Sequence, residues 1–238
     1  MENNSETLLA KIKEVNKKGW IKTLRKGDTG VGYTLETELG IRANSNQKPD
    51  FHGIEIKAFR RRSIGKLVTL FSQVPNWKKS NTNRSEVLNE YGYLDANERF
   101  NLYCSVFGHE KNTLNWKLEV DRINKKINIF NNDKIVTFWN FEKIEERILK
   151  KHDQTFFVYS DTKIENGKEY FLYNKILITQ KASLENFLKL IENGKVCMDF
   201  VMHRKKNGTT RDHGFLWRIR SNSIPDLFEN QKTVDLTH

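Results

Sequence analysis

The sequence is poor in cysteine and proline and contains no long apolar run. Its two cysteines, Cys104 and Cys197, stand far apart and outside any Cys-x-x-Cys pair, so we expect reduced thiols rather than a zinc site. With 3 prolines and 11% aromatic residues, the chain is not a low-complexity segment. No stretch approaches the roughly 18 apolar residues of a membrane-spanning helix, and the first residues lack the basic and apolar regions of a signal peptide. These absences indicate a folded, cytoplasmic protein.

Acidic residues are also few relative to basic ones. Asp and Glu number 30 against 41 Lys and Arg, which gives a formal net charge of +11 at pH 7. A surplus of this size favours a polyanionic partner, either nucleic acid or an anionic membrane surface. The alternative is a basic protein without such a partner. The length of 238 residues permits one large domain or two closely associated lobes.

Hydrophobic periodicity predicts a mixed α/β protein without a regular βαβ alternation. Helices are expected over residues 5–18, around Leu35 and Leu39, and over 141–151 and 183–192. Strands are expected over 54–59, 67–71, 99–106, 114–121, 125–130, 156–160 and 170–178. The Asn207-Gly208 pair between two alternating runs predicts a final hairpin. Residues 74–98 look polar and irregular.

One predicted strand carries an acid and a lysine among isoleucines. Because side chains alternate along a strand, Glu55 and Lys57 share one face and the intervening apolar residues share the other. Asp50 lies just before a turn in which Gly53 allows a sharp bend. That bend can bring the Asp50 carboxylate beside Glu55, which would make an oxygen-rich pocket with a lysine at its edge.

Two clustered carboxylates repel each other and are costly to bury without a counter-ion. Mg²⁺ favours one or two protein carboxylates, with water and a substrate phosphate completing its shell. Such a site suits hydrolysis of a phosphodiester, with Lys57 holding the attacking water or offsetting charge in the transition state. On spacing alone, a paired surface salt bridge is an equally good explanation. Asp161 and Lys163, with Asp153 upstream, repeat the pattern but lead into a turn.

The glycines at Gly27, Gly30 and Gly32 also resemble a nucleotide-binding loop at first sight. However, no Gly-Lys-Ser/Thr follows them, and the third glycine of a dinucleotide fingerprint is missing. Close approach of the backbone to DNA, or tight packing at the start of the following helix, explains them better.

Basic residues supply candidates for DNA contacts, in which phosphate contacts position a protein and base contacts select a sequence. The candidates are Arg25, Lys26, Arg60, Arg61, Arg62, Arg204, Lys206, Arg211, Asp212, His213, Arg218 and Arg220. Lys78–Lys79, Lys125–Lys126 and Lys150–Lys151 are further phosphate candidates. Arginine makes bidentate hydrogen bonds to guanine, and acidic side chains accept hydrogen bonds from cytosine. The final hairpin therefore fits a G·C-rich site read in the major groove. An exposed, charged hairpin without a role in binding is the alternative.

Strict alternation along the last strand of this hairpin divides its polar residues between two faces. Arg211 and His213 would share one face, and Asp212 would join Arg218 and Arg220 on the other. The apolar residues further along favour burial of the Arg211 face.

The segments GDTGVGYTLETELGI, PDFHGIEIKAFR and LVTLFSQVPNW together resemble the MvaI/BcnI family of type II restriction endonucleases. That family is similar to the mismatch-repair endonuclease MutH, and both belong to the PD-(D/E)xK nuclease superfamily. The resemblance is strongest over about residues 19–77 and extends more loosely over the whole chain. It implies an α/β core with a mixed central sheet flanked by helices. It also implies a catalytic lobe near 1–110 and a DNA-recognition lobe near 111–238, part of which returns to the core.

The resemblance also implies roles for individual residues. Asp50 and Glu55 match the family's metal-binding acids, and Lys57 matches its catalytic lysine. Glu36 matches an auxiliary acid that contacts the metal through water, although a solvated helix glutamate would look the same. Ile56 would contribute its backbone carbonyl to the metal.

The activity implied is Mg²⁺-dependent cleavage of double-stranded DNA by a monomer that needs no protein partner. The expected target is pseudosymmetric, CC-N-GG, in the form CCWGG, cut after the second C to leave 5′-phosphates and one-nucleotide 5′ overhangs. A MutH-like nicking enzyme, a non-catalytic DNA-binding module and a toxin-like ribonuclease are the alternatives.

Overall fold

The computed structural model describes residues 4–41, 49–61 and 65–237. The chain forms two compact units: unit 1 comprises Met1–Lys66, Leu149–Ala182 and Phe228–His238, and unit 2 comprises Leu67–Ile148 and Ser183–Leu227. Unit 1 takes in the later segments 149–182 and 228–238, and unit 2 takes in residues 67–110, which the sequence placed in the first of two lobes, near 1–110 and 111–238. The reason is strand pairing, which joins segments that are distant in sequence and leaves residues 67–110 with the second half of the chain.

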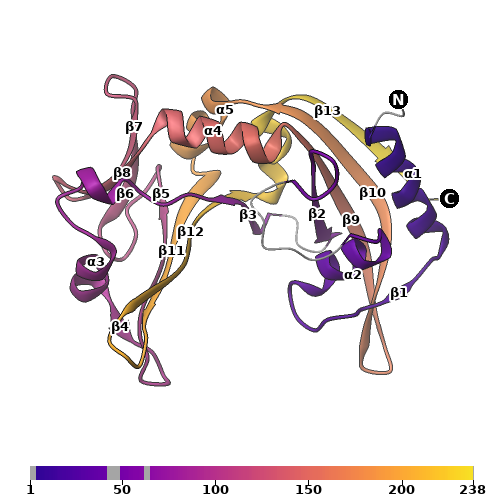
Figure 1. Cartoon of the computed structure of the whole chain (residues 1–238), viewed down its shortest axis with the longest axis horizontal. Coiled ribbons are helices and arrows are strands. Elements are labelled where there is room, and N and C mark those ends of the chain that lie inside the picture. The colour runs from indigo at the N-terminus through magenta and orange to yellow at the C-terminus, as the bar shows by residue number, and fades with distance from the viewer. Residues whose placement is uncertain (1–3, 42–48, 62–64, 238) are drawn as a thin grey trace. The chain divides into compact units, whose positions relative to one another are not determined.

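Unit 1 is built on a mixed five-stranded sheet. Its strands are β1 (Ile21–Lys22), β2 (Ile54–Arg60), β9 (Gln154–Glu165), β10 (Lys168–Ala182) and β13 (Phe228–Asp235). β2 pairs in parallel with β9, whereas β10 pairs antiparallel with β9 on one side and with β1 and β13 on the other. Figure 1 shows β10 as a long curved strand between β9 and β13.

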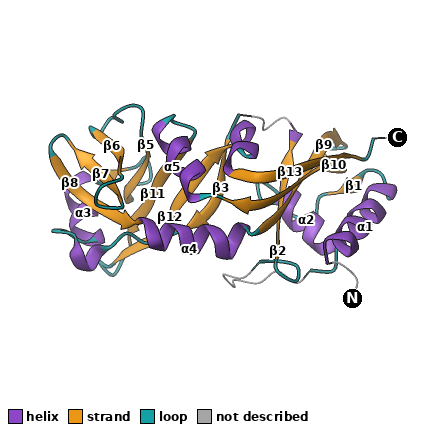
Figure 2. Ribbon diagram, turned by 90° about the horizontal axis from the view of Figure 1, so that it is seen from above, coloured by secondary structure: helices purple, strands orange, loops and turns teal. Residues whose placement is uncertain are grey.

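Two helices, α1 (Asn4–Lys17) and α2 (Gly30–Glu38), pack on this sheet (Figure 2). Their buried residues, among them Leu8, Ile12 and Leu35, form one hydrophobic core with Ile54 and Ile56 of β2. Helical periodicity predicted α1 within one residue at each end, because its apolar positions recur on the face that is buried.

Unit 2 contains two antiparallel sheets. One has the order β3 (Leu67–Ser72), β12 (Thr210–Arg220), β11 (Val196–Arg204), β5 (Phe100–Phe107) and β4 (Tyr93–Leu94). The other is a meander of β6 (Trp116–Asp121), β7 (Lys126–Asn131) and β8 (Lys134–Asn140). Its remaining elements are α3 (Arg84–Tyr91), α5 (Leu184–Glu192) and the short helices η2 (Trp77–Lys79), η3 (Ser221–Ser223) and η4 (Pro225–Leu227).

Aromatic rings fill the core of unit 2. Trp217 on β12 lies 5.1 Å from Trp139 and 5.3 Å from Phe187 of α5, measured between ring centroids. Trp116 lies 5.1 Å from Phe200 of β11. Helix α5 and the meander therefore cover the apolar face of the five-stranded sheet, and edge-to-face ring contacts of this kind add to simple area burial.

Helix α3 lies in the stretch expected to be irregular, so that expectation was wrong. Asn83 caps the helix by accepting hydrogen bonds from Ser85 and Glu86 backbone N–H groups, and the Glu86 side chain accepts from the Asn83 N–H in return. This Asn-x-x-Glu capping box is readable in the sequence and stabilises a helix whose own periodicity is weak.

Helix α4 (Phe141–His152) contains the division between the units, because Ile148 belongs to unit 2 and Leu149 to unit 1.

The α+β class is as predicted, with a mixed sheet and flanking helices. Among the described residues, no helix is long and apolar enough to cross a membrane.

Candidate active site

A tight turn brings Asp50 to the start of β2. Phe51 and Ile54 exchange two backbone hydrogen bonds of 2.9 and 2.8 Å around His52 and Gly53. Both central residues have positive φ, 45° and 93°, as a two-residue type I′ turn requires, and glycine adopts this conformation without steric cost. The turn returns Asp50 alongside the strand, where its Oδ2 accepts a hydrogen bond of 3.0 Å from the Ile56 N–H.

Strand β2 carries Glu55 and Lys57 on the face opposite its isoleucines, as alternation predicted. Lys57 Nζ lies 3.3 Å from Glu55 Oε1. A second lysine, Lys151 in the last turn of α4, places its Nζ 2.6 Å from Glu55 Oε2. This contact is an ion pair by distance, with angles outside those of a regular hydrogen bond. Glu55 is only 3% exposed, so both of its oxygens are surrounded by protein.

Helix α2 supplies Glu36. Its first residue, Gly30, packs so closely that an added Cβ would lie 2.3 Å from the Arg25 carbonyl oxygen. This close packing supports the packing explanation for Gly30, whereas an added Cβ at Gly27 would meet nothing within 4 Å. At the other end, the N–H groups of Gly40 and Ile41 donate to the carbonyls of Thr37 and Glu36, which is a Schellman cap with Gly40 in the left-handed region. Packing at one end and this cap at the other fix the turn that carries Glu36.

The acids are electrostatically coupled. Burial raises the pKa of Glu55 above its ordinary value, Lys57 opposes that rise, Asp50 adds to it, and Lys151 also opposes it. Burial raises the pKa of Glu36 as well, and the charges of Asp50 and Glu55 raise it further. Asp50, Glu55 and Lys57 all lie close enough to Glu36 to act on it electrostatically, so the structure brings these four side chains into one cluster in unit 1.

The cluster offers oxygen donors to a hard cation. Among the described residues, no three His, Cys, Asp or Glu side chains form a complete ligand set by themselves. Mg²⁺ does not need one, because one or two carboxylates with water and phosphate suffice. A 3%-exposed carboxylate next to a second carboxylate is the environment in which a divalent cation would offset repulsion. The residues present therefore fit a Mg²⁺ site completed by the substrate.

Comparison with known proteins identifies the family of the chain. The model of the MvaI/BcnI restriction endonuclease family matches residues 9–228. The chain belongs to this family. No curated protein matches the sequence. Members of this family are type II restriction endonucleases, so the chain is a site-specific deoxyribonuclease.

Two solved structures are similar over nearly the whole chain. One is described as the restriction endonuclease MvaI–cognate DNA substrate complex, with 27% sequence identity, a TM-score of 0.83 and 100% of both chains covered. The other is restriction endonuclease MvaI in the absence of DNA, with 26% identity, a TM-score of 0.59 and 98% of both chains covered.

The second acid-x-lysine pattern does not form a comparable cluster in this family member. Asp161 pairs with Arg61 at 3.3 Å and accepts a hydrogen bond from Asn174. Lys163 pairs with Glu165 at 3.0 Å, where both side chains are at least 40% exposed. These are surface pairs, which explains why the same spacing has different consequences at the two places.

Several predicted DNA contacts in unit 1 are engaged within the protein. Arg60 binds Glu169 through two nitrogens at 2.7 Å and donates to the carbonyls of Gly27 and Asp28, so it braces the glycine-rich loop. Arg25 is exposed and stacks 3.9 Å above the Tyr33 ring, and Lys26 is exposed. Arg62 lies outside the described residues.

The final hairpin contains a β-bulge that changes the predicted faces. Phe200 pairs with Phe215, but Met202 pairs with Asp212, so one extra residue intervenes on β12. Asp212 therefore shares the face of Phe215, where it binds Arg84 at 2.9 Å. Arg211 shares the opposite face with Arg218. Strict alternation predicted the reverse and was wrong, since it assumes an unbroken ladder.

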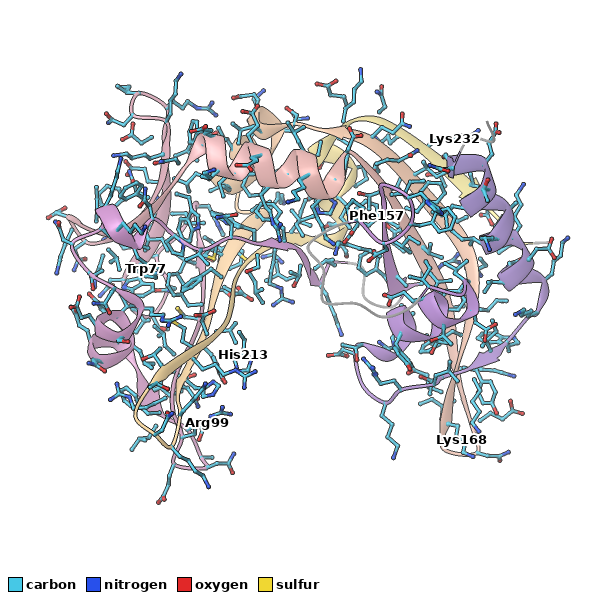
Figure 3. The ribbon with its side chains drawn as sticks, in the orientation of Figure 1. Trp77, Arg99, Phe157, Lys168, His213 and Lys232 are labelled. Carbon is cyan, nitrogen blue, oxygen red and sulfur yellow. The ribbon has the colours of Figure 1, made fainter. Side chains whose placement is uncertain are left out.

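Polar contacts occupy this opposite face of the sheet. Asp199, 7% exposed, accepts hydrogen bonds from Ser105 at 2.6 Å and from Arg218 at 2.7 Å. His203 Nδ1 and His213 Nε2 lie 3.1 Å apart, and Figure 3 shows His213 at the same end of the sheet as Arg99.

The remaining candidate DNA contacts of the hairpin differ in their surroundings. Arg204 donates to Asn89, Arg220 lies 5.8 Å from the Phe107 ring centroid, and Lys206 and Arg211 are exposed.

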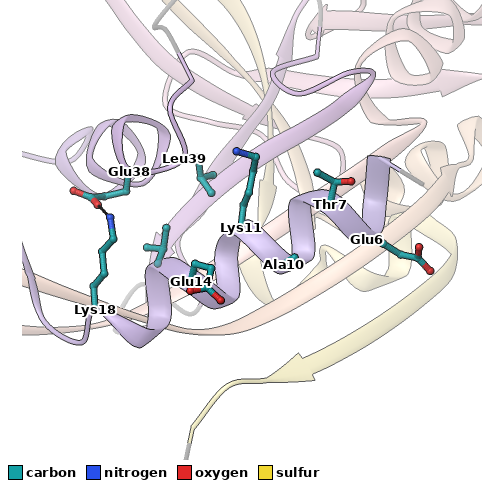
Figure 4. Close-up of a pocket in the computed structure, with 9 residues that line it drawn as sticks. Glu6, Thr7, Ala10, Lys11, Glu14, Lys18, Glu38 and Leu39 are labelled. Carbon is teal, nitrogen blue, oxygen red and sulfur yellow. Dashed lines mark hydrogen bonds and ion pairs between the residues drawn. The ribbon is translucent and has the colours of Figure 1, made fainter. Parts of the chain in front are cut away.

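A depression of about 600 Å³ between α1 and α2 is separate from the acid cluster (Figure 4). An ion pair of 2.7 Å between Lys18 and Glu38 crosses its edge. None of the four clustered residues lines it.

Lys151 is a close neighbour of Glu55 that the sequence analysis did not identify. The Lys150–Lys151 pair is a predicted phosphate contact, and in the structure Lys151 lies against Glu55. No local pattern in the sequence signals this contact, because it depends on β9 returning the chain parallel to β2.

Proposed function

We propose that this restriction endonuclease cleaves double-stranded DNA by Mg²⁺-dependent hydrolysis at the cluster of Glu36, Asp50, Glu55 and Lys57. The observation that carries the proposal is the hydrogen bond from the Ile56 N–H to Asp50. It holds that carboxylate beside a strand that already presents Glu55 and Lys57. Similarity to an enzyme whose structure is described as a complex with cognate DNA substrate supports DNA as the partner.

Each residue of the cluster would have a role that follows from its chemistry. Asp50, Glu55 and the Ile56 carbonyl would hold Mg²⁺, and Glu36 would contact it through water. When bound, the cation polarises the scissile phosphate and lowers the pKa of a coordinated water. Lys57, a cation 3.3 Å from Glu55, orients the attacking water and offsets negative charge that develops on the phosphate. Glu36, whose pKa burial raises, is suited to exchange a proton with water.

The polar face of the five-stranded sheet in unit 2 supports a role in reading DNA bases. Arg211, Arg218 and Arg220 lie on this face, with the two histidines at its end. Arg218 is held by Asp199, which pre-orders its guanidinium and limits the entropy lost on binding. Exposed Arg25 and Lys26 beside the glycine-rich loop are suited to phosphate contacts.

We propose the target CC-N-GG in the form CCWGG, cut after the second C to give 5′-phosphates and one-nucleotide 5′ overhangs. Arg211, Arg218 and Arg220, on the polar face of the five-stranded sheet, suit guanine, which this target contains on both strands. The enzyme would act in the cytoplasm as a monomer, without an obligatory protein partner. A single catalytic centre would then cut the two strands in separate events.

Digestion of plasmid DNA with and without Mg²⁺, followed by sequencing of the ends, tests the proposal. We expect cleavage only with the cation and only at CCWGG, with the stated ends. Cleavage at unrelated sites, or in the presence of EDTA, contradicts it.

The same assay separates the alternatives. A MutH-like enzyme would nick one strand and require a partner, so cleavage of both strands by the purified chain excludes it. A non-catalytic module would cut DNA neither as wild type nor as D50A. A ribonuclease would cut RNA with little dependence on DNA sequence.

A further inference from the structure

Each oxygen of Glu55 faces its own lysine. Lys57 Nζ lies 3.3 Å from Oε1, and Lys151 Nζ lies 2.6 Å from Oε2. Lys57 reaches its oxygen from the same strand. Lys151 comes from a different element, the last turn of α4, and makes the shorter contact of the two.

The burial of Lys151 sets it apart from its neighbour in the helix. Its side chain is 16% exposed, close to the 18% of Lys57, whereas Lys150 is exposed to solvent. Lysine carries a flexible, strongly hydrated charge whose natural place at a helix end is in water. Withdrawing it into the site costs hydration and side-chain entropy, which only the unscreened attraction to a buried carboxylate offsets.

The charges of the cluster explain what this contact does. Glu36, Asp50 and Glu55 are three acids, and the two lysines leave them one positive charge short of neutrality. A divalent cation added to this cluster would exceed neutrality by one charge. It would also be repelled by Lys151, which already occupies the space beside Glu55 Oε2. Binding of a cation through Oε2 would therefore displace or weaken that ion pair.

We infer that Lys151 is the resident counter-ion of Glu55, a positioning residue that holds the carboxylate in the cation-free enzyme and competes with the divalent cation for it. The inference rests on the proposed function, because it presumes that Glu55 takes part in cation binding. Lys151 thereby determines the cation concentration at which the cation occupies the site. Its flexible side chain moves aside when the cation binds.

Calcium titrations of the full-length protein test this inference without relying on activity. K151Q removes the charge but keeps an amide donor near Glu55 Oε2. We expect it to bind Ca²⁺ about tenfold or more tightly than wild type in calorimetry, since it lacks a cation within a few ångströms of the ligand. K151R keeps the charge and should bind Ca²⁺ as wild type does. K150Q loses the same charge from the exposed neighbouring position and serves as the matched control.

Thermal unfolding provides a second readout if K151Q folds poorly. In EDTA, K151Q should unfold at a lower temperature than K150Q, and saturating Ca²⁺ should raise its midpoint by more than it raises that of wild type. Ca²⁺ affinity of K151Q equal to or weaker than wild type, or no extra recovery with Ca²⁺, overturns the inference. If wild type cleaves DNA and binds Ca²⁺ but K151Q does not bind more tightly, only the inference fails. If wild type neither binds Ca²⁺ nor cleaves, the proposed function fails with it.

Discussion

The Asp50 carboxylate accepts a hydrogen bond of 3.0 Å from the backbone N–H of Ile56. This single bond links the residue before the turn to the middle of β2. It therefore fixes the Asp50 carboxylate beside the strand that carries Glu55 and Lys57.

Removal of the Asp50 charge should abolish cleavage while leaving the fold intact. D50N keeps the side-chain shape and can still accept from the Ile56 N–H, but it loses the charge that a divalent cation needs. We expect the cleavage rate to fall by at least about a hundredfold, as for loss of other groups that stabilise charge in the transition state. Single-turnover cleavage of plasmid DNA measures it, with circular dichroism to check folding.

D161N is the matched control for D50N. It alters the other acid-x-lysine pattern of the chain, where Asp161 pairs with Arg61 at the surface. Cleavage by D161N should stay within a few-fold of wild type. Equal loss in both variants would mean that the cluster around Glu55 has no special role.

The cap of α2 should be sensitive to substitution of Gly40. Its φ is 73°, and its N–H closes the Schellman motif on Thr37. G40A should lower the free energy of unfolding by about 1 kcal/mol, because alanine is strained in the left-handed region. Urea denaturation measures this change.

G32A tests whether that loss comes from conformation. Gly32 lies inside the same helix, where an added Cβ would meet only Glu36 Oε1, at 3.8 Å, and alanine favours helix. We expect its stability to equal or exceed that of wild type. A destabilisation similar to that of G40A would show that any added methyl group near Glu36 is harmful.

Arg218 and Arg211 share a face of the sheet but should respond differently to substitution. R218M leaves Asp199, 7% exposed, without its guanidinium partner, so we expect destabilisation of about 3 kcal/mol. R211M changes an exposed residue, so it should weaken DNA binding without changing stability. Urea denaturation and DNA-binding titrations in Ca²⁺ separate the two effects. Identical behaviour of the variants would contradict the distinct environments assigned to them.

The stability of the protein should fall as His203 becomes protonated. Burial lowers the pKa of His203, and the charges of Arg99, His213 and Arg211 lower it further. The unfolded chain, with a histidine pKa of about 6.5, therefore binds the proton more readily than the folded protein. Stability is retained above that value and lost as the pH falls through about 6.5 toward the lowered folded pKa.

Urea denaturation from pH 8 to pH 5 measures this effect. H203Q should flatten the loss of stability in that window, because the side chain no longer titrates. H109Q, at an exposed histidine, should keep the wild-type slope. A wild-type slope in H203Q would refute the assignment.

The part of the candidate site on and before β2 was readable from the sequence because its determinants are local, whereas Glu36 came from the family resemblance. Period-two alternation fixes that Glu55 and Lys57 share a face, and the glycine of the turn fixes that Asp50 returns toward them. The capping box of α3 was equally local and could have been found, but its weak periodicity hid it. The β-bulge of the final hairpin was not readable, because alternation gives no sign of where a ladder slips.

The sequence by itself determined the α+β class, the shared face of Glu55 and Lys57, and the basic charge that suits a polyanion, since each follows from composition or from neighbours along the chain. Only the tertiary structure decided which late segments join the amino-terminal unit, which arginines are already paired, and that Lys151 lies against Glu55. The physical reason is that these relationships arise from pairing between strands far apart in sequence. The partners available to a buried charge are those that strand pairing brings next to it.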